Sequence, residues 1–278
     1  MAATIFKVKQ LTEGVYALGN CFVNAYLIVG KDKALLFDNG YGFGDMKSAI
    51  RSITDLDYDV VLSHGHFDHA GGCGDFLGPI CIHEKEVPVA RRHLTPDYRK
   101  IALAAGKAVQ KFLFWRCVIP KGIDEAAYIA CGGYDRWAFV KAGDTFDLGG
   151  TTMEVVELPG HTEGSIGLLC KEKRILLVGD AIGPSPWLHL PESTSLQTYV
   201  NMLKKTKELE FDQYLMAHRA VLAPKSDLDA YLAVAEDLDW ENGKVQKKAI
   251  YSSDAQARQC WRRGTRKGTS IVISEDKL

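Results

Sequence analysis

Histidine and aspartate side chains crowd into one short stretch of the chain, His64-Gly65-His66-Phe67-Asp68-His69. Imidazole nitrogens and carboxylate oxygens are the ligand types that bind Zn²⁺ and related first-row metals. A lone histidine near a strand end is more often a hydrogen-bonded surface or core group, but four ligand-type residues within six positions disfavour that interpretation. A tight turn can point the first two histidines one way and the Asp-His pair another. This segment therefore predicts ligands for two neighbouring metal ions.

Three further ligand-type residues share one local context, because each directly follows an apolar segment. They are His161, Asp180 and His218. Taken alone, each is equally well explained as a turn residue. Strand ends on one edge of a sandwich can converge, however, so their shared placement predicts that they join the first segment in a single site.

The elements that must position these residues are predicted to be short strands with helices between them. Apolar segments bounded by Gly, Pro or charged turns predict strands at residues 22–29, 34–37, 59–63, 151–158, 166–170, 174–178 and 214–216. Helical spacing of apolar residues predicts helices at residues 45–53, 195–210 and 226–240, the second capped by Ser193 or Thr194. Strands in both halves, with helices interspersed, predict a two-sheet sandwich covered by helices.

An insertion at about residues 84–137 interrupts this regularity with a helical stretch and an aromatic-rich part. We expect it to cover the mouth of the metal site, because loops at that edge differ most among related folds. Its aromatic residues either line an apolar substrate pocket or belong to the core or a subunit contact. They are Tyr98, Phe112, Phe114, Trp115, Tyr128, Tyr134 and Trp137.

The C-terminal residues 241–278 carry nine Lys/Arg against four acidic residues. A basic stretch of this kind is most often a solvated surface. We expect this basic extension to pack on the same domain as residues 1–240. Nucleic-acid binding would require a longer basic stripe tied to a recognisable module, so no nucleic-acid partner is expected.

The composition is that of an ordinary globular protein. Lys+Arg 34 against Asp+Glu 35 leaves a net charge of -1, which provides no field to attract nucleic acid or a membrane. No run of about 18 apolar residues is present, and the first residues lack the pattern of a secretory signal. Seven cysteines without Cys-x-x-Cys spacing argue against a disulfide framework and favour a reducing, cytoplasmic location. Homo-oligomer formation is left open.

The segment at residues 64–72 resembles the signature of the metallo-β-lactamase-fold hydrolases. Leu158-Pro159-Gly160-His161, Val178-Gly179-Asp180 and Ala217-His218 resemble the later motifs of that superfamily in the same order. The resemblance covers roughly residues 5–240, apart from the insertion. It implies an α/β fold of the αββα four-layer sandwich type, with residues 1–240 as the catalytic domain.

The resemblance also implies an assignment of the ligands. One metal would be bound by His64, His66 and His161, the other by Asp68, His69 and His218, with Asp180 bridging the two. Two divalent ions, zinc by preference with iron or manganese as alternatives, would supply a metal-bridging hydroxide near neutral pH. That hydroxide would attack an ester, lactone or thioester substrate with an apolar portion, a small molecule. Asp68 is the predicted catalytic residue, which orients the nucleophile and carries its proton.

Single residues weigh against several members of the superfamily. True β-lactamases generally lack an aspartate bridge of the Asp180 type, and di-iron flavoproteins usually place a glutamate where this chain has His66. Many acyl-homoserine lactonases place a tyrosine shortly after the bridge, which residues 181–183 lack. Glyoxalase II-like thioesterases share the bridge, but their basic glutathione-binding pattern is not found. A mononuclear iron oxidoreductase of persulfide dioxygenase type and a phosphodiesterase are the alternatives, the latter supported only by the basic extension.

Substrate contacts are predicted at two places. Trp115 and Arg116 would suit an apolar group with an anion nearby. Trp187 and His189 closely follow the bridging aspartate, and His189 is a hypothetical proton donor. The two remaining histidines are expected to be structural or solvent-facing. They are His83 and His93.

Overall fold

The first of the two large sheets is a seven-stranded sheet whose strands pair in sequence order. The computed structural model describes residues 5–113, 118–131, 133–246 and 256–278. Pairing is antiparallel from the first to the fourth strand and parallel from the fourth to the seventh. The strands are β1 (Lys7–Thr12), β2 (Val15–Asn20), β3 (Val23–Val29), β4 (Ala34–Phe37), β5 (Tyr58–Val61), β6 (Ile80–Ile82) and β7 (Trp137–Phe139).

The second sheet has six strands in the order β14-β13-β11-β10-β9-β8. The pair β11 and β13 is parallel, and the other pairs are antiparallel. Its strands are β8 (Thr145–Asp147), β9 (Thr152–Glu157), β10 (Ile166–Cys170), β11 (Ile175–Gly179), β13 (Gln213–Met216) and β14 (Arg219–Pro224).

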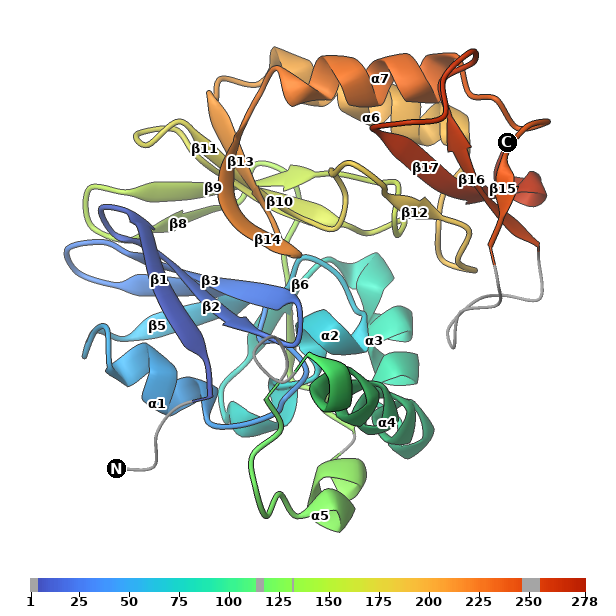
Figure 1. Cartoon of the computed structure of the whole chain (residues 1–278). Coiled ribbons are helices and arrows are strands. Elements are labelled where there is room, and N and C mark those ends of the chain that lie inside the picture. The colour runs from blue at the N-terminus through green and yellow to red at the C-terminus, as the bar shows by residue number, and fades with distance from the viewer. Residues whose placement is uncertain (1–4, 114–117, 132, 247–255) are drawn as a thin grey trace.

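The two sheets pack face to face around a shared apolar core, in which residues such as Phe37 of β4 and Leu168 of β10 are buried. Helices α6 (Leu196–Glu208) and α7 (Asp227–Glu236) cover the outer face of the second sheet (Figure 1). On the first sheet, the outer face packs against α1 (Met46–Arg51), α2 (Phe67–Ala70) and α3 (Val87–His93). The predicted αββα four-layer sandwich is therefore confirmed.

Every strand and helix predicted from periodicity overlaps an element of the structure, with ends shifted by a few residues. The cap of α6 differs from the prediction. Ser195 caps this helix, because its side chain accepts a hydrogen bond from the amide of Thr198. The hydroxyl of Ser193 instead donates to the carbonyl of His161 across 2.8 Å. Ser193 therefore supports the loop that carries His161 rather than the helix.

The insertion connects β6 to β7 and contains the 3-10 turn Glu84–Glu86, then α3, α4 (Pro96–Phe112) and α5 (Glu125–Ala130). Another 3-10 turn, Cys73–Asp75, precedes β6. Arg99 on α4 is buried and donates to the carbonyl of Gly71, directly after α2. Tyr128 and Tyr134 belong to the core, whereas Phe112 is 73% exposed. The predicted contacts Trp115 and Arg116, like Phe114, lie outside the described residues.

The C-terminal extension contributes three strands to a third sheet, which has the order β12-β17-β16-β15 and takes β12 from residues 187–188. Its strands are β12 (Trp187–Leu188), β15 (Lys244–Val245), β16 (Ala257–Trp261) and β17 (Ser270–Ser274), followed by a 3-10 turn at Glu275–Lys277. All five residues of β17 are buried. The expectation of a solvated surface thus holds for basic residues such as Arg262 and Arg266 and for β15, but not for the buried strand β17.

Among the described cysteines, Cys73, Cys81, Cys131, Cys170 and Cys260 are free thiols, and Cys21 is disulfide-bonded. The odd cysteine count had not predicted this bond. Within the part of the chain that the structure describes, no helix is both long and apolar enough to cross a membrane.

Candidate metal centre

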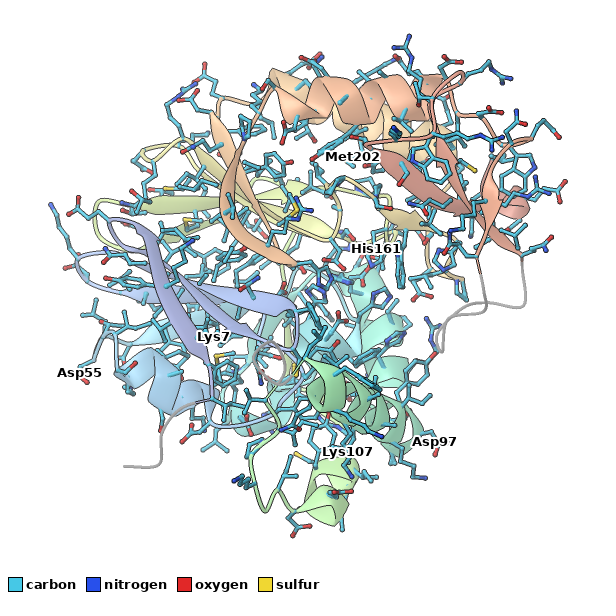
Figure 2. All side chains as sticks on the ribbon, viewed as in Figure 1. Lys7, Asp55, Asp97, Lys107, His161 and Met202 are labelled. Carbon is cyan, nitrogen blue, oxygen red and sulfur yellow. The ribbon has the colours of Figure 1, made fainter. Side chains whose placement is uncertain are left out.

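All seven predicted ligands meet at one edge of the sandwich. They come from the loops after β5, β9, β11 and β13, as the strand-end argument predicted. In the first loop, His66 is the N-cap of the short helix α2, so the next two ligands lie on its first turn. Figure 2 shows His161, from the loop after β9, between the two halves of the molecule. The sequence-distant positions therefore form one site, divided into two clusters.

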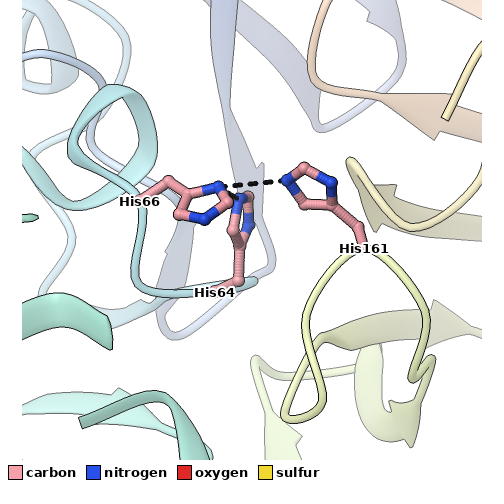
Figure 3. Close-up of side chains that lie close together, drawn as sticks. All are labelled: His64, His66 and His161. Atoms are coloured by element: carbon pink, nitrogen blue, oxygen red, sulfur yellow. Dashed lines mark hydrogen bonds between the residues drawn. The ribbon is translucent and has the colours of Figure 1, made fainter. Parts of the chain in front are cut away.

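The first cluster consists of three buried imidazoles, shown in Figure 3. Nδ1 of His66 lies 3.0 Å from Nε2 of His64 and 3.0 Å from Nε2 of His161. The opposite ring nitrogens are each engaged elsewhere. His161 Nδ1 donates to the carbonyl of Trp187 across 3.0 Å, and His66 Nε2 donates to the carboxylate of Glu192 across 2.6 Å. Each inner nitrogen therefore presents a lone pair to the centre of the cluster.

The second cluster combines two carboxylates with two imidazoles, from Asp68, His69, Asp180 and His218. Oδ2 of Asp180 lies 3.0 Å from Nε2 of His218 and 3.4 Å from Nε2 of His69. The outer nitrogen of His218 donates to the carbonyl of Phe22 across 2.9 Å. Asp68 Oδ2 is 3.5 Å from the same nitrogen of His69. Two acids and two tautomer-fixed imidazoles thus converge here.

Asp180 lies between the two clusters. Its Oδ2 atom is also 3.8 Å from Nε2 of His161, which belongs to the first cluster. The same oxygen therefore approaches imidazoles of both clusters. This is the position that a bridging carboxylate requires.

Burial and charge act differently on the two clusters. Burial holds the pKa of His64 well below its usual 6.5 and lowers the pKa of His161 to about 4, an effect to which the neighbouring imidazoles add. Burial also acts to lower the pKa of His218, but the carboxylates of Asp180 and Asp68 outweigh it and raise that pKa to about 9. The first cluster offers uncharged nitrogens at neutral pH, and the second attracts positive charge.

Two buried polar atoms of the clusters lack a hydrogen-bond partner within the described protein. Nε2 of His69 and Oδ1 of Asp180 are buried without a hydrogen-bond partner among the described residues. An unsatisfied buried polar atom costs about 1–3 kcal/mol. The converging lone pairs of the first cluster repel one another in the same way. Cations bound in the two clusters would remove both penalties, so these residues fit a two-metal centre.

Asp38 was not singled out in the sequence, yet it supports ligands of both clusters. Its carboxylate accepts hydrogen bonds from the amide of Ser63 at 2.7 Å and from its hydroxyl at 2.9 Å. Because that hydroxyl donates to Asp38, it accepts from Nδ1 of His64 at 2.9 Å. Asp38 also accepts from Nδ1 of His69. Only the Asp38-Asn39-Gly40 turn after a predicted strand marked this position.

Glu86 clamps the two loops that carry the first cluster. Its carboxylate, 1% exposed, accepts from the amide of Gly65 at 2.8 Å and from the amide of Gly164 at 2.9 Å. A Cβ on Gly164 would lie 2.8 Å from the Glu86 carboxylate, so a larger residue would displace this acceptor. Burial raises the pKa of Glu86. No sequence motif indicated this clamp.

Glu192 and His93 form a further polar network beside the first cluster. Glu192 accepts from His66 and from Arg92, whose Nη2 lies 2.6 Å from Oε2. His93 is buried, stacks on the ring of His66 at 4.6 Å and has its Nε2 3.6 Å from Oε1 of Glu192. His93 is therefore not solvent-facing. His83 is also buried, and its Nδ1 accepts from the amide of Lys85.

A cavity of about 560 Å³ opens onto both clusters. Its wall is largely apolar, and its polar groups include the guanidinium groups of Arg92 and Arg219. Among the described aromatic residues of the insertion, Tyr98 lines the cavity. The other aromatic residues in the wall are Tyr41, Phe67 and Trp187. His189 is buried behind this wall, with its ring 5.2 Å from that of Trp187.

Comparisons with known proteins agree with this geometry. Residues 18–218 match the model of a family described as the metallo-beta-lactamase superfamily. The chain is 24% identical over 208 residues to the acyl-coenzyme A thioesterase MBLAC2 of Gallus gallus, covering 72% of this chain and 71% of that protein. It is 27% identical over 165 residues to the hydroxyacylglutathione hydrolase GloC of Haemophilus influenzae, covering 57% of this chain and 66% of that protein.

A solved structure shows the same fold. A metallo-beta-lactamase family protein from Thermus thermophilus superposes with a TM-score of 0.60 at 21% sequence identity. The match covers 81% of this chain and 80% of that chain.

Proposed function

The chain belongs to the metallo-beta-lactamase superfamily, and from this premise we propose that it is a dinuclear metal-dependent hydrolase of thioesters with an apolar acyl portion. Zinc is the proposed metal. The observation that supports two metals rather than one is the position of Asp180, whose Oδ2 approaches imidazoles of both clusters. A single structural zinc is normally coordinated by four protein ligands, whereas seven candidate ligands converge here.

The side chains of the centre divide the work of hydrolysis. When bound, two divalent ions lower the pKa of a coordinated water toward neutrality and polarise a substrate carbonyl. Asp68 lines the cavity; we assign it to orient the attacking water and to accept its proton. Asp38, Glu192 and the carbonyl of Trp187 hold the imidazoles in the tautomers that leave the inner nitrogens free.

A thioester is favoured over the other acyl compounds by two independent relatives. The names of both describe hydrolysis of an acyl group carried on a thiol. The chain itself supplies an apolar wall suited to the acyl part, including Ile182, Leu190 and Met216. Arg219, exposed at the cavity beside the ligand His218, would face an anionic carrier.

Metal analysis followed by a substrate panel tests this proposal. We expect about two zinc ions per purified chain, with hydrolysis of acyl thioesters faster than that of lactones, β-lactams or phosphodiesters. Comparing short and long acyl chains on one carrier measures recognition of the acyl part. Comparing one acyl chain on different carriers measures recognition of the carrier. A single iron per chain, or hydrolysis of phosphodiesters alone, would contradict the proposal.

A further inference from the structure

Much of the cavity wall comes from one segment, residues 183–192, which we call the wall segment. Gly183 to Trp187 and Leu190 to Glu192 line the cavity, directly after the bridging Asp180. This segment contains Pro184, Pro186 and Pro191. Proline has no backbone N–H, so this segment has few amides of its own that could donate to its carbonyls. Those carbonyls therefore depend on amides of a neighbouring segment.

That neighbour is the C-terminal strand β17. The amide of Ser270 donates to the carbonyl of Pro184 at 2.9 Å, and the amide of Val272 donates to the carbonyl of Pro186 at 3.0 Å. β12 then pairs with β17 in parallel, with Leu188 opposite Ile273. Both of these side chains are fully buried. The wall segment is thus held by residues 80 or more positions later in the chain.

The same strand supports a metal ligand through one intermediate group. Trp187 lies opposite Val272 in the strand pair, and its carbonyl accepts from Nδ1 of His161 at 3.0 Å. His189, directly after β12, is buried beside Trp187, with the two ring centroids 5.2 Å apart. Displacement of β17 would therefore move the acceptor that orients His161.

We propose that strand β17 positions both the wall segment and His161, so that the C-terminal extension is a working part of the catalytic unit. This inference rests on the proposed two-metal centre. A carbonyl that fixes the tautomer and orientation of a metal-bound imidazole affects metal affinity about 10–100-fold in known sites. Only the first cluster contains His161, so the dependence on β17 is specific for one of the two metals.

The test compares two substitutions at one position. Val272→Pro removes the N–H that donates to the carbonyl of Pro186. Val272→Ala retains this N–H and shortens only the side chain. Zinc is titrated into the apo form of each full-length variant in competition with a chromophoric chelator, which resolves the two binding steps. His161→Ala identifies the step that belongs to the first cluster.

We expect Val272→Pro to weaken the step identified with His161→Ala by about 10–100-fold and to leave the other step close to wild type. Val272→Ala should resemble wild type in both steps. Equal weakening of both steps, or wild-type binding by Val272→Pro, would overturn the inference while the two-metal proposal stands. Absence of two binding steps in the wild type would instead reject the proposed function itself.

A second pair covers the case in which Val272→Pro does not fold. Ile273→Ala removes a buried side chain opposite Leu188 of β12, whereas Ile271→Ala removes an equally buried one whose pairing partner is Cys260 of β16. We expect only Ile273→Ala to weaken the step assigned to His161. Equal effects of the two substitutions would overturn the inference.

Discussion

Oδ2 of Asp38 lies 2.9 Å from Nδ1 of His69, although 31 residues separate them in the chain. The same carboxylate accepts from the hydroxyl of Ser63, which in turn accepts from His64. One buried acid thus orients an imidazole in each of the two clusters. Its backbone φ of 65° lies in the left-handed region, where Asn and Asp are tolerated better than most residues.

Asp38→Asn should weaken metal binding in both clusters, by about 10–100-fold where the oriented ligand depends on it. Asparagine tolerates the same backbone conformation, so the effect should come from the lost charge and acceptor oxygen rather than from strain. Competition with a chelator measures the affinity, and the exposed Asp55→Asn is the matched control. Unchanged affinities in Asp38→Asn would show that the carboxylate does not support the ligands.

Asp68→Ala should abolish hydrolysis, because the substitution removes both a ligand of the second cluster and the proposed proton acceptor. Asp68→Asn retains an oxygen ligand but accepts a proton poorly. We expect its kcat to fall about 100-fold or more, with a smaller loss of metal. Steady-state kinetics and metal content of the two variants separate these roles. Full activity in either variant would refute the proposed mechanism.

Glu86→Ala should lower the free energy of unfolding by about 2–5 kcal/mol, since the amides of Gly65 and Gly164 would each lose a buried acceptor. Glu86→Gln retains one carbonyl oxygen and should lose less. Urea denaturation measures both, and the exposed neighbour Glu84→Ala is the control. Equal stabilities of Glu86→Ala and Glu84→Ala would rule out the clamp.

A comparison of wild type with Glu86→Gln should reveal a pH dependence of folding stability. Burial raises the pKa of Glu86 above its ordinary 4.5. As the pH rises past 4.5, the unfolded chain releases this proton first while the folded chain retains it, so folding stability falls with rising pH until the raised pKa is passed. Wild type should therefore lose stability relative to Glu86→Gln between about pH 4 and the raised pKa. A constant or growing advantage of wild type would contradict this sign.

Removal of the metals should destabilise the protein. The vacated clusters would retain converging lone pairs and two neighbouring carboxylates, and free metal at 100 times its Kd stabilises a folded state by about 3 kcal/mol. Thermal unfolding with and without a chelator should show a lower Tm in the apo form, restored by added zinc. A variant with both His64 and His69 replaced by alanine should show little shift. An equal shift in that variant would indicate an effect unrelated to the clusters.

The candidate ligands and the core strands could be predicted from the sequence because their signals are local. A buried strand followed by a polar turn, as at Val61 and His64, is encoded by neighbouring residues. The strands that escaped prediction are mostly short or half-exposed. In Lys7–Thr12, at a sheet edge, apolar and polar residues alternate only weakly, and Thr145–Asp147 has only three residues. Such segments acquire strand structure from their partners rather than from their own apolar pattern.

The residue types and spacing of this chain were thus enough to predict the candidate metal ligands and the sandwich that carries them. The supporting groups depended on folding in three dimensions. Glu192 reaches His66 across 126 residues, and the amide of Val272 reaches the carbonyl of Pro186 across 86 (272 − 186). A carboxylate or an amide becomes a partner only when two distant segments pack together, and no periodicity along the chain records that pairing.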